Sequence, residues 1–100
     1  MLKHIIMFKF KDSFDGKTGA ENAAKVAEMS ENLIGRIPEL RESATHLNCI
    51  ASPINYDLVI ELSFDDAAGM GAFHVHPLHM ELVKFADAAT DSISAVDYEY

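Results

Sequence analysis

The spacing of apolar residues changes several times along this chain, and the order of these changes constrains the fold more than any other feature. Alternating, β-strand patterns occupy Leu2–Phe10, Tyr56–Phe64 and Ser92–Tyr100, with a weaker one at Arg41–Ile50. Residues Glu21–Ile34 carry the stripe of an amphipathic helix. A second helical region follows the third strand pattern. The sequence therefore predicts the order β-α-β-β-α-β.

Start and stop signals support these boundaries. Asp65-Asp66 predicts a helix start, because a carboxylate there accepts from the first free N–H groups. His76-Pro77 predicts a break and a restart, since proline suits the first helical position. Gly35 is a candidate stop for the first helix. Asp12 to Gly19 has the composition of a turn.

Two helices between four strands predict a ferredoxin-like α+β layer, with one antiparallel sheet and both helices on one of its faces. The 100 residues suffice for one domain with one core, so we expect residues 1–100 to form a single domain. No apolar run approaches the ~20 residues of a membrane span.

The opposite face of such a sheet would be bare and apolar. It would present Ile5, Met7 and Val59, with one or two of Val96, Tyr98 and Tyr100. A contiguous apolar patch on a small protein usually marks an interface. We therefore expect a two-fold homodimer with sheet packed on sheet, closed as a dimeric α/β barrel. The alternative is that neighbouring Lys and Glu side chains half cover these residues.

The charge argues against nucleic-acid and membrane partners, and the cysteine content indicates the redox compartment. The net charge is −8 and the few Lys and Arg residues are scattered, so neither nucleic acid nor an anionic membrane surface is an expected partner. Cys49 is the only cysteine, which fits a reducing compartment and a cytoplasmic location. It has no basic neighbour in the sequence, and we expect a buried, unreactive thiol.

Three of the five histidines, His74, His76 and His79, lie close together. Three interpretations remain open. The first is a metal site, although no cysteine or carboxylate follows at an established ligand spacing. The second is structural, with His76 capping a helix and His79 bonded to the backbone. The third is catalytic, with His79 pointing into a cavity between helix and sheet.

His4 bears on this choice, because it shares a strand face with Ile6 and Phe8 that we expect beneath the helices. A polar ring in apolar surroundings needs a partner. Either a backbone group satisfies it, or His4 and His79 line one pocket from opposite walls. Tyr56 could add a hydroxyl to that pocket or lie at its rim.

Five segments in this order resemble the stress-responsive A/B barrel (Dabb) domain family: Lys3–Lys11, Ile37-Pro38, Tyr56–Val59, His76–His79 and Val96–Tyr98. The resemblance extends over essentially the whole chain. It implies a ferredoxin-like subunit and a homodimer closed as an α/β barrel.

The family includes a plant cyclase that closes a linear polyketide by aldol chemistry without a cofactor. By resemblance, His79 matches its catalytic base and His4 a pocket histidine. Phe73 and Leu58 stand where that enzyme has a tyrosine and a histidine. The implied mechanism is general acid–base catalysis: neutral His79 removes a proton α to a carbonyl, and His4 or water donates to the oxyanion.

The main hypothesis is a homodimer that binds a small hydrophobic carbonyl or aromatic compound, with cofactor-free cyclase or lyase activity. No cofactor and no metal are expected. The alternatives are a stress-associated structural dimer and a dimeric α/β barrel monooxygenase, for which His74 or His79 would be the candidate haem ligands. The expected ligand-binding residues, besides catalytic His79 and His4, are Tyr56, Leu58, Phe73, His76, Ile6, Phe8 and Leu82.

Overall fold

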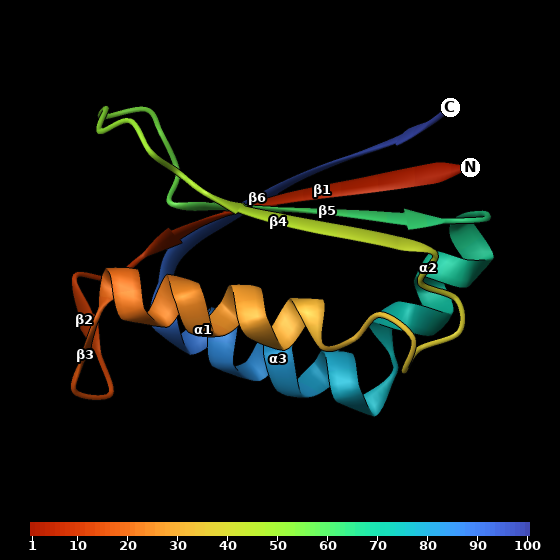
Figure 1. Cartoon of the computed structure of the whole chain (residues 1–100), viewed down its shortest axis with the longest axis horizontal. Helices are drawn as coiled ribbons and strands as arrows, with labels where there is room; N and C mark the ends of the chain where they lie inside the picture. The colour runs from red at the N-terminus through yellow and green to blue at the C-terminus, as the bar shows by residue number, and fades with distance from the viewer.

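A four-stranded antiparallel sheet forms the centre of the computed structural model, which describes residues 1–100 (Figure 1). The strands are β1 (Leu2–Phe10), β4 (Glu42–Leu47), β5 (Leu58–Phe64) and β6 (Thr90–Glu99). Their order across the sheet is β4-β5-β1-β6, so the first strand lies between the third and the last of the four. This topology confirms the ferredoxin-like α+β fold.

All three helices lie on the same side of this sheet (Figure 1). They are α1 (Gly19–Glu31), α2 (Ala67–His74) and α3 (Pro77–Ala89). No helix covers the other side. None of the three combines the length and the apolar character that crossing a membrane requires.

Side-chain caps begin all three helices, and those at Asp66 and His76 are where the sequence signals predicted. Helix α1 begins at Gly19, two residues before the predicted start at Glu21. Asp66 accepts from the backbone N–H of Gly69 at 2.9 Å and starts α2. His76 caps α3, because its Nδ1 accepts from the N–H of Leu78 at 3.1 Å. At α1, Thr18 accepts from the N–H of Glu21 at 3.1 Å, and the Glu21 carboxylate accepts from the N–H of Thr18 at 3.0 Å. Satisfying these N–H groups fixes where each helix begins.

The structure differs from the sequence-based boundaries in the turns. The predicted turn from Asp12 to Gly19 contains a small hairpin of β2 (Ser13–Phe14) and β3 (Lys17–Thr18). Asp15 and Gly16 at its tip have φ angles of 56° and 73°, which a tight two-residue hairpin requires. Helix α1 ends at Glu31 and not at Ile34, so Gly35, at φ 81°, lies in the turn that follows the helix.

The connection between β4 and β5 is longer than predicted, because both strands are shorter than their sequence patterns. It occupies residues 48–57 and extends beyond the sheet on the side away from the helices (Figure 1). Cys49 lies in it and is exposed, so the prediction of a buried thiol was wrong. The chain has left strand pairing after Leu47, and no element covers Cys49.

The hydrophobic core lies between the sheet and the helices. Strand β5 contributes every second residue, and Leu58 and Phe64 are at most 2% exposed. The rest of the core comes from β1, the helices and the segment after α1: Phe8, Phe10, Ala23, Val26, Leu33, Ile37, Leu40, Phe73, Leu82, Ala86 and Ala89.

No helix covers the opposite sheet face, and its centre is apolar, as the alternation predicted, with Lys3, Lys9 and Glu61 around it. Ile5 of β1 pairs with Val96 of β6, and Met7 pairs with Val59 of β5. Val96 is 56% exposed and Tyr98 is 45% exposed. We call this surface the open face.

Truncation of Phe64 tests the core. Its ring is fully buried, with its centroid 5.1 Å from that of Phe73. We expect Phe64→Ala to lower the free energy of unfolding by about 3–5 kcal/mol, because a large cavity forms. Urea denaturation measures this loss. The control Ile50→Ala removes an exposed side chain and should change stability by less than about 0.5 kcal/mol. Equal losses in the two variants would contradict the assignment of the core.

Candidate functional site

A cavity of about 230 Å³ lies between the helix-covered face of the sheet and α3. Strand β1 contributes His4, Ile6 and Phe8, and α3 contributes His79 and Leu82. The further lining residues are His74, Val83, Ala86, Asp87, Ile93 and Ala95. Apolar groups therefore form most of the wall, and three imidazoles are the main polar groups.

The histidines gather at one end of this cavity because of the strand register and the helix direction. His4 is near the start of β1 and pairs with Asp97 of β6, whereas Phe8 pairs with Ile93 at the other end. His79 lies in the first turn of α3. His74 is the last residue of α2, and the short α2–α3 corner brings it back beside His79.

His79 is held in one tautomer. Its Nδ1 lies 3.1 Å from the backbone carbonyl oxygen of His74. A carbonyl oxygen only accepts, so Nδ1 carries the hydrogen and Nε2 of the neutral ring carries the lone pair. No protein group bonds to this Nε2. Burial lowers the pKa of His79, partly opposed by the bond to the His74 carbonyl, so the ring is neutral at neutral pH.

His4 has a carboxylate partner. Nδ1 of His4 bonds to Oδ1 of Asp97, the neighbouring residue on β6. His4 as a whole is 8% exposed. The carboxylate accepts, so Nδ1 of His4 is the donor. This bond fixes the orientation of the ring and leaves Nε2 of His4 without a protein partner.

The His74 ring lies between the other two. Its centroid is 5.2 Å from that of His4 and 5.4 Å from that of His79. Burial lowers the pKa of His74, and the nearby His4 lowers it further, while Asp97 acts in the opposite direction. Neither ring nitrogen of His74 has a protein hydrogen-bond partner. No group of three or more His, Cys, Asp or Glu side chains, these included, is arranged to hold a metal ion.

Of the residues predicted to form the site, the structure brings His4, His79, Ile6, Phe8 and Leu82 to this cavity. Phe73 lies behind it, with its ring centroid 4.4 Å from that of His79. His76 uses Nδ1 as the cap of α3 and does not line the cavity.

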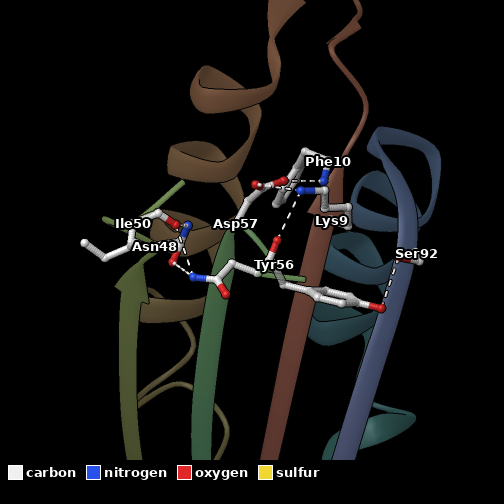
Figure 2. A network of polar contacts seen from close by, with 8 residues as sticks. Lys9, Phe10, Asn48, Ile50, Tyr56, Asp57 and Ser92 are labelled. Carbon is white, nitrogen blue, oxygen red and sulfur yellow. Dashed lines mark hydrogen bonds and ion pairs between the residues drawn. The ribbon is translucent and has the colours of Figure 1, made fainter. Parts of the chain in front are cut away.

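Tyr56 and Leu58 are placed elsewhere. Both border a separate hollow of about 310 Å³ that Met7 and Val59 also line. The Tyr56 ring extends across β1 to β6, where its hydroxyl bonds to Ser94 at 3.0 Å (Figure 2 shows its second partner, Ser92). Ser94 points away from the helices, so this hydroxyl lies on the open face.

The backbone explains the position of Tyr56. The N–H of Asp57 donates to the carbonyl of Phe8 at 2.8 Å. The Asp57 carboxylate accepts from the N–H of Phe10 at 2.8 Å (Figure 2). These bonds hold the chain beside the end of β1 before β5 begins. The strand alternation therefore does not extend back to Tyr56.

Six of the lining residues were not predicted as site residues: His74, Val83, Ala86, Asp87, Ile93 and Ala95. His74 matters most among them, because its ring lies between those of His4 and His79. It was considered only as a metal or haem ligand. The signal available was its distance of five residues from His79 across the His76-Pro77 break. That distance indicates a bent connection, but not which way the ring points.

Comparisons with known proteins agree with this fold. The chain is 33% identical over 101 residues to an uncharacterised protein of Streptomyces coelicolor, with both chains fully covered. A dimeric ferredoxin-like protein of unknown function from Bacteroides fragilis superimposes with a TM-score of 0.80 at 25% identity, over 99% of this chain and 95% of that one. A hydroxynitrile lyase from Passiflora edulis gives a TM-score of 0.80 at 18% identity, over 97% and 90%.

The family model for the Stress Responsive A/B Barrel Domain matches residues 2–100. The match covers the four sheet strands, the three helices and the histidine-lined cavity described above. The chain therefore belongs to the stress-responsive A/B barrel (Dabb) family.

Proposed function

We propose that this protein is a homodimer that binds a small, largely apolar carbonyl or aromatic compound beside His4 and His79, and that these histidines carry out cofactor-free acid–base chemistry on it. One observation carries the proposal: Nε2 of His79 is fixed as an unpaired base at the end of an apolar cavity.

The size and lining of the cavity indicate the ligand class. An apolar cavity of about 150 Å³ accommodates benzene. The cavity in this protein, at about 230 Å³, accommodates a single ring or a short chain with small substituents. Ile6, Leu82 and Ile93 offer apolar surface for its body, and the histidines at one end offer partners for its polar group.

His79 would act as the base. Its Nε2 accepts a proton from the carbon α to a carbonyl; the C–H bond breaks and the electron pair moves onto the carbonyl oxygen. The ring then becomes an imidazolium that still donates from Nδ1 to the His74 carbonyl, so the new positive charge lies against an oxygen. The pKa of His79, lowered by burial, keeps the base unprotonated at neutral pH.

His4 would act as the acid. In its doubly protonated form Nδ1 remains bonded to Asp97, which supplies the counter-charge, and Nε2–H donates to the developing oxyanion. Asp97 acts as a positioning residue because it orients the ring through the nitrogen that faces away from the reaction.

A structural role explains the cluster less well. The three adjacent imidazoles keep ring nitrogens that bond to no protein group, and these nitrogens are accessible to a ligand, because Ser43 Oγ is the one buried side-chain polar atom without a partner. A purely structural dimer does not need them.

The open face supports the homodimer. Val96 and Tyr98 are about half exposed on the sheet face that no helix covers. The Bacteroides fragilis protein of the same fold is described as dimeric. Packing two open faces together removes apolar surface from water. This burial stabilises the dimer by about 25 cal/mol for each Å² of apolar surface buried.

Ligand binding can be tested by thermal-shift screening with small carbonyl and aromatic compounds. A ligand at 100 times its Kd should stabilise the protein by about 2.7 kcal/mol. We expect His79→Leu to abolish that stabilisation, because it removes both nitrogens but retains bulk. The control Met80→Leu changes an exposed side chain of the same helix outside the cavity and should keep it. An identical ligand profile in His79→Leu would show that His79 is structural.

The dimer can be tested with a charge on the open face. We expect the wild type to sediment as two copies and Val96→Asp to shift toward one copy, because an unpaired carboxylate would be buried at the interface. Val75 is 74% exposed at the α2–α3 corner, so Val75→Asp is the matched control and should remain dimeric. A wild type that sediments as a stable single copy would exclude the dimer.

The neutral state of His79 and His74 can be tested through stability. The pKa values of both are lowered by burial, so below their ordinary value of about 6.5 the unfolded chain takes up protons that the folded chain does not. The free energy of unfolding is therefore highest above pH 6.5. It falls as the pH drops from 6.5 through the lowered pKa values of the folded state. Urea denaturation from pH 7.5 to 5.5 should show a shallower fall in His79→Leu than in the wild type. The control Leu40→Ala truncates a core residue outside the cavity and should lower stability at every pH without changing the slope.

A further inference from the structure

We propose that a hollow between the β2–β3 hairpin and the outer surfaces of α1 and α3 binds a small aromatic zwitterion, of which a free aromatic amino acid is the simplest example. The volume of the hollow is about 390 Å³. Small-molecule sites typically have volumes of roughly 300–1,000 Å³. The lining residues are Phe14, Asp15, Lys25, Glu81, Lys84, Phe85 and Ala88. None of them lines the histidine cavity, so this is a second, separate site.

Helix α3 presents a different set of side chains to each of the two sites. The hollow is lined by Glu81, Lys84, Phe85 and Ala88. Helical positions three, four and seven residues apart share one face, so these four side chains form one stripe. Leu82, which lines the histidine cavity, is not part of that stripe. One helix can therefore serve both sites.

The wall formed by the hairpin is fixed to both helices, at the point where α1 begins and α3 ends (Figure 1). Asn22 of α1 is 1% exposed, and its Nδ2 donates to the carbonyl oxygen of Phe14 at 3.1 Å. The backbone N–H of Lys11 donates to the Ala89 carbonyl at 3.0 Å, and its Nζ donates to the Ala88 carbonyl at 2.9 Å. The hollow is therefore preformed, which lowers the entropic cost of binding a ligand.

Two partly buried phenylalanine rings supply the apolar surface of the hollow. The centroids of Phe14 and Phe85 are 5.9 Å apart, in an edge-to-face arrangement. Nζ of Lys25 lies 4.1 Å from the centroid of Phe85, and Nζ of Lys11 lies 5.8 Å from that of Phe14. Cation–π attraction holds an ammonium group in such a position. A positive charge therefore lies directly beside the surface on which a ligand ring would pack.

The charged side chains around these rings have no ionic partner in the protein. None of Asp15, Lys25, Glu81 and Lys84 takes part in an ion pair of the structure. Two positive and two negative groups thus line one hollow without contacting one another. A ligand with both charges would pair its carboxylate with the lysines and its ammonium group with the carboxylates.

The mixed charge of the lining selects among aromatic ligands. An aromatic anion would be attracted by two lysines and repelled by two carboxylates, and an aromatic cation would meet the reverse. A neutral aromatic compound would contact the rings alone. An aromatic amino acid carries a carboxylate and an ammonium group on one carbon, one methylene away from its ring. It matches both signs of charge and the apolar surface.

The test compares three compounds that share one benzene ring: L-phenylalanine, 3-phenylpropionate and phenethylamine. The second lacks the ammonium group and the third lacks the carboxylate. Affinities are measured at neutral pH and low salt by titration followed in amide NMR spectra. We expect L-phenylalanine to bind about fivefold more tightly than either of the others, because each of them loses one charge pair. About 0.5 M NaCl should reduce this preference, because salt screens exposed charges.

Two variants assign the preference to residues. Lys25→Gln should weaken the binding of L-phenylalanine but not that of phenethylamine, which has no carboxylate. Glu81→Gln should weaken the binding of L-phenylalanine but not that of 3-phenylpropionate, which has no ammonium group. The matched control is Lys3→Gln, because Lys3 lies outside the hollow and its Nζ is 5.4 Å from the Tyr100 ring centroid in a similar cation–π contact. It should change none of the affinities. Substitutions of this kind at the surface leave the fold intact.

The location of the shifted amides completes the test. Shifts around Phe14, Lys25 and Phe85, with a preference for L-phenylalanine that both variants reduce, support the site. Equal affinity for the three compounds, a preference that either variant leaves unchanged, or no shifts at the hollow overturns it. Shifts confined to the surroundings of His4 and His79 overturn it too, because the ring then binds in the histidine cavity. His79→Leu should leave L-phenylalanine binding unchanged, so the proposed function can fail without affecting this result.

Discussion

The pairing of β1 between β5 and β6 is the constraint on which the rest of this structure depends. Successive residues of a strand point to opposite faces, so one register fixes two surfaces. It directs His4, Ile6 and Phe8 toward the helices, where they line the cavity, and Ile5 and Met7 toward the open face. A shift of one residue would expose the cavity wall and bury the open face.

The alternation of apolar residues was sufficient to predict this arrangement, because a period of two is a local property. The bare face and the inward position of His4 followed from it, and the topology followed from the order of strands and helices. Tyr56 was assigned to the wrong face because the alternation was extended beyond the true start of β5. The bonds from Asp57 to Phe8 and Phe10 end the strand there, and such long-range contacts leave no periodic signal. The exposed position of Cys49 has the same origin in the longer loop.

The site was predictable in part for a related reason. His4 and His79 follow from a strand face and a helix stripe, but the place of His74 depends on how α2 turns into α3. The cap that His76 forms on α3 sets that corner. The corner in turn places the His74 carbonyl against Nδ1 of His79. The tautomer of the candidate base is thus set by a backbone oxygen, which no residue type in the sequence encodes.

Strand β6 connects the two proposed functional surfaces. It lies at the edge of the sheet, and its consecutive residues Val96, Asp97 and Tyr98 alternate between the faces. Asp97 points toward the helices and orients His4, whereas Val96 and Tyr98 point to the open face. In an isolated subunit this segment is paired on one side only and is largely exposed. In the proposed dimer, a second copy packed on Val96 and Tyr98 would restrain the backbone between them, so dimer formation and the orientation of His4 would depend on the same three residues.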